Sequence, residues 1–213
     1  MKKHLIFLLI STPVLSFSQI GLKAGINFAN ITNASSISNS SRSGFHIGAF
    51  LAPSSQNIVG SRTELIFSRQ GYHYKSGSNT GSVNLDYIML PQFMAINITK
   101  YVQIQVGAQM AYLLNAKVDS TNSGSSTGNS ILDFYNRFDY GFGGGMEIHP
   151  AGGLLIGARM NFSLGNLYHS DTYSTGSQPS FVPDIDVKNN LFQVFAGWQF
   201  GKQSSSKKKS KKK

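Results

Sequence analysis

The sequence predicts an all-β protein, an eight-stranded antiparallel up-and-down transmembrane β-barrel. Three observations predict it: segments that alternate apolar and polar residues, a secretory leader before them, and connections of alternating length. A period of two is the spacing at which successive side chains of a β-strand point to opposite faces. Outer-membrane barrels have an even number of such strands, short periplasmic turns and longer extracellular loops.

The start of the chain has the parts of a signal peptide. Lys2 and Lys3 form a charged start, Leu5–Ile10 is apolar, and small residues precede a cleavage site near Ser18/Gln19. The apolar run is far shorter than the roughly 20 residues that a helical span needs. We therefore expect export of the chain to the outer membrane and removal of the leader.

Three regions follow from this pattern: a signal peptide over 1–18, a barrel over 19–201 and a disordered Lys/Ser-rich tail over 202–213. Nine of the ten net positive charges come from the two ends, because residues 19–201 contain ten Lys and Arg against nine Asp and Glu. A nearly neutral barrel does not favour a nucleic-acid partner. The chain has no cysteine, which excludes disulfides and thiolate metal sites.

The first four predicted strands differ in how clearly they alternate. Ile20–Ala29 is apolar at its even positions, and Phe45–Leu51 is apolar at its odd positions. Arg62–Gln70 has charged and polar residues at most even positions. Val83–Ile98 has an unresolved phase, because three consecutive apolar residues precede Pro91, which cannot donate a ladder hydrogen bond. A bulge near Pro91 is the candidate point at which this strand switches faces.

The last four predicted strands alternate regularly. Val102–Tyr112 sets apolar even positions against glutamines and a glycine, and Phe138–Ile148 sets them against Asp, Gly and Glu. Ile156–Leu164 opposes its apolar residues with Gly, Arg, Asn and Ser. Asn190–Phe200 has one continuously apolar face that ends in tryptophan and phenylalanine. The length of each predicted strand is near or above 9 to 11 residues, the number with which a tilted strand crosses the apolar layer of the membrane.

The predicted connections alternate between long and short, as outer-membrane barrels require. The long ones are Asn30–Arg42, Lys75–Gly81, Ala116–Ser130 and Tyr168–Lys188. The short ones are Pro53–Ile58, Asn97–Lys100 and His149–Gly152. With eight strands, both termini then lie on the periplasmic side.

We expect the apolar faces to contact outer-membrane lipid and the polar faces to line the lumen. Aromatic residues near strand ends are predicted to lie at the membrane interfaces: Tyr72, Tyr74, Tyr101, Tyr168, Trp198 and Phe200. A secreted, lipocalin-like barrel that binds a small ligand is the alternative, because a soluble barrel alternates in the same way with its apolar faces inward.

Charged residues on the inward faces are predicted to form a structural lumen network: Arg62, Glu64, Asp139, Glu147 and Arg159. The interior of an eight-stranded barrel is just wide enough for side chains to fill it, and buried ions must be paired. Glu64 and Arg159 lie at similar heights on strands four apart. We therefore predict that these two side chains meet across the lumen.

Three short stretches carry a family resemblance. Ile20–Phe28, Thr63–Tyr72 and Tyr87–Pro91 together resemble the PorT-like outer-membrane β-barrel family, across the whole mature barrel. In this family an acidic residue commonly precedes an apolar residue and a proline, here Leu90 and Pro91, and this chain has Met89 at that position. The resemblance implies an outer-membrane protein and, in the family's namesake, a part in protein secretion.

The expected function is that of a monomeric, non-catalytic barrel with a structural role or an accessory role in secretion or transport. Its expected partners are lipid and other envelope or secretion proteins, with no cofactor and no metal. An outer-membrane lipid-modifying enzyme is a further alternative. For that activity, the four histidines beyond the leader (His46, His73, His149 and His169) show no Ser and acid at a triad spacing.

Overall fold

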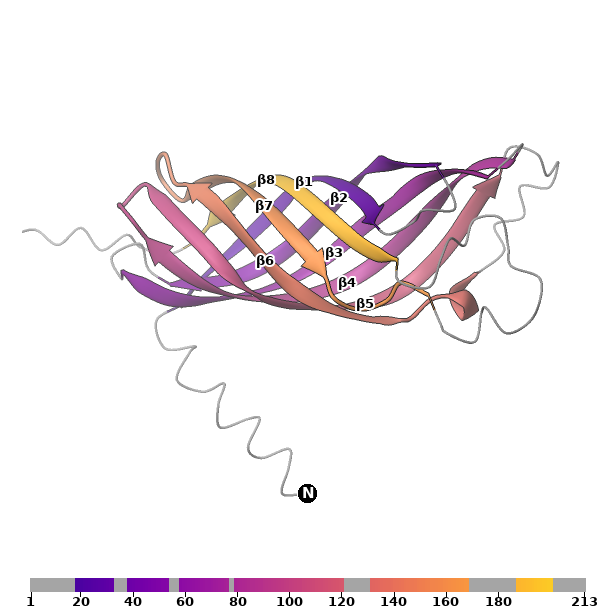
Figure 1. Cartoon of the computed structure of the whole chain (residues 1–213). Coiled ribbons are helices and arrows are strands. Elements are labelled where there is room, and N and C mark those ends of the chain that lie inside the picture. The colour runs from indigo at the N-terminus through magenta and orange to yellow at the C-terminus, as the bar shows by residue number, and fades with distance from the viewer. Residues whose placement is uncertain are drawn as a thin grey trace, which may run out of the picture.

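The computed structural model describes residues 18–32, 38–53, 58–76, 79–120, 131–168 and 187–200. The predicted leader, apart from its last residue, the predicted tail and His169 lie outside these ranges. The described strands form one closed antiparallel barrel in sequence order, in which β8 pairs with β1 (Figure 1). The predicted fold class is confirmed.

The strands differ in length. They are β1 (Ser18–Thr32), β2 (Ser38–Pro53), β3 (Val59–Ser76), β4 (Asn79–Asn97), β5 (Val102–Ser120), β6 (Phe138–Ile148), β7 (Leu154–Ser163) and β8 (Lys188–Gln199). A short 3-10 helix, η2 (Leu132–Phe134), precedes β6. At about 3.4 Å per residue and a tilt of about 40°, the 18 residues of β3 rise about 44 Å, against an apolar membrane band of about 25 Å.

Strands β3, β4 and β5 therefore extend beyond the others at the end of the barrel opposite the start of β1 and the end of β8 (Figure 1). The β5–β6 ladder ends at Tyr112↔Phe138, whereas the β4–β5 ladder continues to Gly81↔Ser120. We call this end the extracellular end, following the predicted topology, in which the short turns are periplasmic. The short turns, the start of β1 and the end of β8 all lie at the other end, which we call the terminus-bearing end.

The predicted short turns match the strand boundaries, but the predicted long loops are mostly too long. Most of Asn30–Arg42 belongs to β1 and β2, and β5 continues to Ser120. The Lys75–Gly81 loop is wrong, since Lys75 pairs with Thr80 and Ser76 with Asn79 in a hairpin. The strict alternation of long and short connections is lost at this hairpin.

The phase of β4 is now resolved. Odd-numbered residues from Val83 to Ala95 face inward throughout, so the strand does not switch faces at Pro91. The bulge lies elsewhere, at the register shift beside Asp86 and Tyr87 in the β4–β5 ladder. Pro91 is accommodated because the β3–β4 ladder skips the pairs opposite Leu90 and Pro91.

The outer wall carries an apolar belt. Its exposed members include Ile20, Leu22, Ile26, Phe45, Ile47, Leu65, Leu90, Met94, Ile104, Val106, Met110, Phe142, Met146, Ile156, Met160, Phe192 and Val194. Glu64 and Arg159, by contrast, are buried inside the cylinder. This polarity is the reverse of a soluble carrier barrel, so the lipocalin-like alternative is wrong.

One exposed polar group interrupts the belt between β3 and β4. Gln92 Oε1 accepts a hydrogen bond from Thr63 Oγ1 at 2.6 Å, and Gln92 Nε2 donates to Ser61 Oγ at 2.5 Å. These contacts satisfy much of the amide's hydrogen-bonding capacity in a region that offers no water.

Above the belt, the polarity of the wall inverts. On β3 and β4, the outward residues directly above the belt residues Phe67 and Ile88 form an ion pair, with Arg69 Nε 2.7 Å from Asp86 Oδ1. Above this height most inward side chains are apolar, although Gln70, directly after Arg69 on β3, is buried and polar. The barrel is therefore apolar outside and polar inside through the membrane, and polar outside and apolar inside above it.

Candidate functional site: the filled lumen

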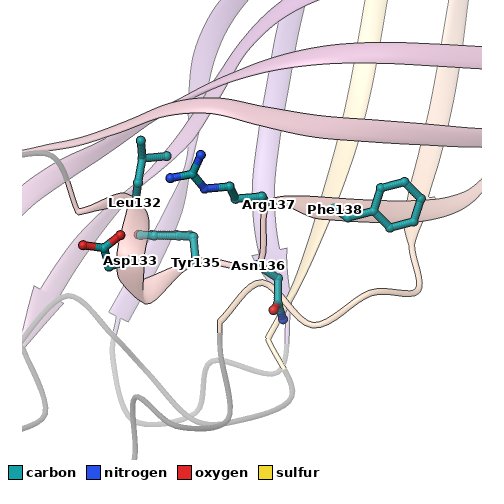
Figure 2. A pocket seen from close by; sticks show the side chains of 6 residues that line it. All are labelled: Leu132, Asp133, Tyr135, Asn136, Arg137 and Phe138. Carbon is teal, nitrogen blue, oxygen red and sulfur yellow. The ribbon is translucent and has the colours of Figure 1, made fainter.

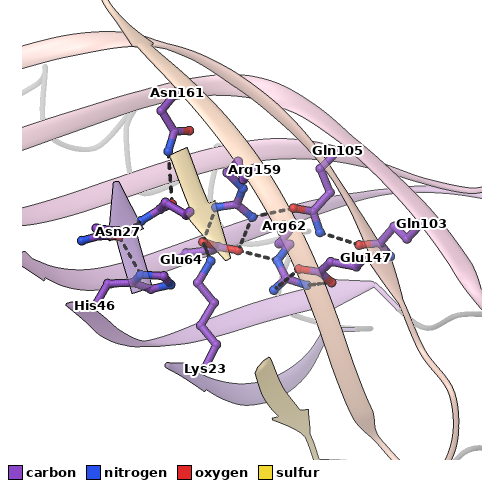
Figure 3. A network of polar contacts seen from close by, with 11 residues as sticks. Lys23, Asn27, His46, Arg62, Glu64, Gln103, Gln105, Glu147, Arg159 and Asn161 are labelled. Atoms are coloured by element: carbon purple, nitrogen blue, oxygen red, sulfur yellow. Dashed lines mark hydrogen bonds and ion pairs between the residues drawn. The ribbon is translucent and has the colours of Figure 1, made fainter. Parts of the chain in front are cut away.

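The lumen contains a cluster of five charged side chains, each at most 2 % exposed: Lys23, Arg62, Glu64, Glu147 and Arg159. They come from β1, β3, β6 and β7, where the period of two directs them inward. Figure 3 shows them converging at the centre of the barrel. We refer to these five residues as the lumen cluster.

Glu64 is the centre of the lumen cluster. Its carboxylate lies 2.7 Å from Arg159 Nη1, 2.5 Å from Arg62 Nε and 2.7 Å from Lys23 Nζ. Glu64 and Arg159 thus meet across the lumen, as predicted from their heights on β3 and β7. The second carboxylate, Glu147, lies 3.0 Å from Arg62 Nη2.

The lumen cluster holds three cations against two carboxylates, and aromatic rings compensate part of this imbalance. Arg62 Cζ lies 3.9 Å from the centre of the Phe50 ring, and Lys23 Nζ lies 4.1 Å from that of Phe195. Stacking on a ring face stabilises a cation that has left water. Phe50 and Phe195 also belong to a small apolar cluster at the terminus-bearing end of the lumen.

Glutamines extend the lumen cluster on one side. Arg159 Nη2 donates to Gln105 Oε1 at 2.5 Å, and Gln105 Nε2 donates to Gln103 Oε1 at 2.8 Å (Figure 3). Both glutamines are buried on β5. They supply the acceptors that an arginine needs when its carboxylate partners do not occupy every N–H.

A neutral polar layer lies on the extracellular side of the lumen cluster and is centred on Asn27. Its amide donates to Ser68 Oγ at 2.9 Å, and its Oδ1 accepts from Gln193 Nε2 at 3.0 Å. His46 Nδ1 is 2.7 Å from the same Oδ1. Because an amide oxygen only accepts, His46 carries its proton on Nδ1 and serves as a structural donor.

The extracellular half of the lumen is filled by an apolar cluster with a tyrosine centre. Tyr72 Oη bonds Tyr168 Oη and lies 3.2 Å from Tyr135 Oη. Tyr135 and Tyr168 also pair through a β-bridge, which joins the segment before β6 to the one after β7. Burial and the neighbouring tyrosines raise the pKa of Tyr135 well above its usual value of 10.0.

This cluster corrects half of the predicted interface aromatics. Tyr72, Tyr74 and Tyr168 are buried inside the barrel and do not face the membrane. The two tyrosines of β3 share the even-numbered, inward phase of Arg62 and Glu64. Continuing the period of two along the strand would have placed them correctly.

The other three predicted interface aromatics point outward. Tyr101, Trp198 and Phe200 are each about half exposed near the terminus-bearing end of the barrel. Lys100 Nζ lies 4.6 Å from the ring centre of Tyr101.

Asp139 faces inward but does not join the lumen cluster. It accepts a hydrogen bond from Ser163 Oγ and lines a small cavity with Tyr87 and Gln109. It forms no ion pair with any residue in the described ranges. Conversely, Lys23 belongs to the lumen cluster although it is not among the predicted lumen charges. Its position on the polar, inward face of β1 is the signal in the sequence that indicates this placement.

The described histidines do not assemble a catalytic triad. His73 lies opposite Ser40 on β2 and Ser82 on β4, and Ser82 lies opposite Asp119 on β5. This row of side chains has the residue types of a hydrolase. However, the His73 imidazole forms no hydrogen bond within the described part of the chain, and the Asp119 carboxylate accepts one from Asn84 at 2.9 Å. Over the same residues, no three His, Cys, Asp or Glu side chains are grouped to hold a metal ion.

A closed eight-stranded cylinder with an apolar belt and a polar lumen defines an outer-membrane β-barrel protein. The chain matches the family described as "Outer membrane protein beta-barrel domain" over residues 11–169, and it belongs to that family. Solved structures agree with this fold. No protein of curated function matches the chain.

Two solved structures are similar to the barrel. Ail, the attachment invasion locus protein of Yersinia pestis in complex with the heparin analogue sucrose octasulfate, is 18% identical, with a TM-score of 0.50 over 86% of this chain and 99% of Ail. Neisserial surface protein A is 16% identical, with a TM-score of 0.51 over 85% of this chain and 97% of that protein. At these identities the likeness shows the fold alone.

Proposed function

We propose that this protein is a monomeric, non-conducting and non-catalytic outer-membrane barrel with a structural role or an accessory role in secretion or surface transport. The observation that supports this most is the filling of the lumen. The lumen cluster occupies the membrane-spanning section, and the tyrosine-centred apolar cluster occupies the extracellular half.

A filled lumen opposes conduction for a physical reason. An ion crosses a barrel through continuous water, but the paired side chains of Arg62, Glu64 and Arg159 are fully enclosed in the lumen. Opening a path would separate Glu64 from Arg62 and Arg159, whose charged atoms lie 2.5 and 2.7 Å from its carboxylate, and would leave unpaired ions in a water-poor interior at a high cost in free energy.

An accessory role in secretion is supported by the resemblance of the strand motifs to PorT-like barrels. On this proposal, partner proteins contact the ends of the barrel, because the outer wall is occupied by lipid. The signal peptide is removed near Ser18/Gln19, and the basic tail at 202–213 remains on the periplasmic side.

Conductance measurements test the proposal. The purified barrel in planar lipid bilayers is expected to show no steady current, while a general porin inserted in the same way conducts. A stable ohmic conductance of the wild-type barrel would overturn the proposed function. Lipid A from a deletion strain is expected to have an unchanged acylation pattern, and a changed pattern restored by wild type but not by His73→Ala would support the enzyme alternative.

A further inference from the structure

A cavity of about 460 Å³ opens beside the extracellular end of β6. It is lined by Leu132, Asp133, Tyr135, Asn136, Arg137 and Phe138 (Figure 2). We refer to it as the rim pocket. The helix η2 supplies one wall, and the first residue of β6 supplies the other.

The rim pocket lies at the extracellular edge of the apolar belt. Phe138 and Tyr140 both point outward and are about half exposed, and their rings stack at a centroid distance of 6.3 Å. Arg137 directly precedes Phe138 in the chain. An outer-leaflet lipid would therefore place acyl chains beside the two rings and its headgroup beside Arg137.

Two opposite charges in the rim pocket have no partner among the residues that the structure describes. The side chains of Arg137 and Asp133 are exposed, and neither forms a hydrogen bond or ion pair with the described residues. Two other cations at this end of the barrel are engaged, Arg69 with Asp86 at 2.7 Å and Lys188 with the Leu164 carbonyl at 2.7 Å, whereas Lys75 and Lys117 are exposed on β3 and β5. Figure 2 shows the guanidinium of Arg137 extending back toward η2, on the side where Asp133 lies.

We propose that the rim pocket binds the phosphorylated sugar headgroup of an outer-leaflet glycolipid. Arg137 donates paired hydrogen bonds to the phosphate, which its planar guanidinium fits in a bidentate manner. Asp133 accepts hydrogen bonds from sugar hydroxyls next to the phosphate. Phe138 contacts the first methylenes of an acyl chain.

The two charges select this ligand over simpler ones. Phosphatidic acid offers a phosphate to Arg137, but it has no headgroup hydroxyls to satisfy Asp133, so the carboxylate would repel it. Free phosphate lacks both the sugar and the acyl chain. The proposal goes beyond the proposed function, and it depends on the extracellular placement of the β6 start.

Calorimetric titration of the folded full-length barrel in detergent micelles tests this inference. The probes are monophosphorylated lipid A, the same lipid A without phosphate, phosphatidic acid and inorganic phosphate. The phosphorylated lipid A is expected to bind at least tenfold more tightly than each of the other three. Arg137→Ala is expected to lose about tenfold in affinity, and Arg137→Lys to lose less.

Matched variants separate the roles of the two charges. Asp133→Asn is expected to weaken lipid A binding and to leave phosphatidic acid binding unchanged or stronger. Lys100→Ala, which removes a cation at the opposite rim, is expected to bind like wild type. Heat-modifiable gel migration verifies that each variant is folded.

Three results would overturn the inference: equal binding of lipid A with and without its phosphate, wild-type affinity of Arg137→Ala, or binding of inorganic phosphate as tight as that of lipid A. The last result would indicate a free-anion site. None of them bears on conduction or catalysis, so the proposed function is tested separately.

Discussion

Replacing Glu64 by glutamine is the sharpest test of the lumen cluster. The substitution preserves the size of the side chain and removes its charge. In the wild type, this one carboxylate lies within 2.7 Å of Lys23 Nζ, Arg62 Nε and Arg159 Nη1. The variant leaves three buried cations, and Glu147 contacts only Arg62 among them.

The magnitude follows from the number of uncompensated ions. Breaking a single buried ion pair by removing one partner costs about 3–5 kcal/mol. Glu64→Gln leaves both Lys23 and Arg159 without a carboxylate in contact, so we expect a loss at the upper end, about 5 kcal/mol. That is a large fraction of the roughly 5–15 kcal/mol by which folded proteins are stabilised.

Urea unfolding in lipid vesicles, followed by the fluorescence of the single tryptophan, measures this loss. The exposed Asp133→Asn is the control and is expected to unfold like wild type. The triple variant Lys23→Met/Glu64→Gln/Arg159→Met restores balance, because Arg62 and Glu147 remain as a pair, and it should be more stable than Glu64→Gln alone. A single variant as stable as wild type, or a triple variant less stable than the single one, would refute the reasoning.

Three further predictions concern other parts of the barrel. Burial raises the pKa of Tyr135, so its neutral hydroxyl stabilises the fold below about pH 10, and this contribution is lost as the pH rises further. In urea unfolding, the free energy of unfolding of Tyr135→Phe should therefore fall less steeply with pH above that value than that of the wild type. Trp198 faces lipid, so brominated lipids should quench its fluorescence and aqueous acrylamide should not; the reverse would place it in water. A Cβ on Gly107 would lie 2.2 Å from the Gln92 carbonyl oxygen, so Gly107→Ala should lower the free energy of unfolding by about 1–3 kcal/mol, and an unchanged urea midpoint would contradict this.

The membrane-spanning half was predictable because lipid outside and paired charge inside impose one consistent alternation. Ile104 and Phe192 on the wall, and Glu64 with Arg159 in the lumen, all follow from the period of two and the strand order. The choice of pairing partners within the lumen was less accessible. Lys23 and Asp139 both face inward, but only packing across the barrel decides that Lys23 reaches Glu64 and Asp139 does not.

The extracellular half was not predictable in the same way, because the polarity rule changes there. Asn30 and Thr32 point outward while Ala29 and Ile31 point inward, which is the pattern of a soluble strand. A Ser/Asn-rich stretch of this kind has the composition of a loop. The prediction for Tyr72 was wrong for a related reason: an aromatic residue near a strand end is as consistent with a membrane interface as with a buried core.

The Arg69–Asp86 ion pair on the outer wall has a consequence for the surrounding lipid. It lies one outward position beyond Phe67 and Ile88, so a thicker bilayer would have to bury a guanidinium and a carboxylate in hydrocarbon. We therefore expect a thicker bilayer to become thinner around the barrel, because moving the protein along the membrane normal would bury this ion pair at a high cost in free energy. The strands fix the local thickness of the membrane, and lipids with longer chains should be depleted from the layer next to the protein.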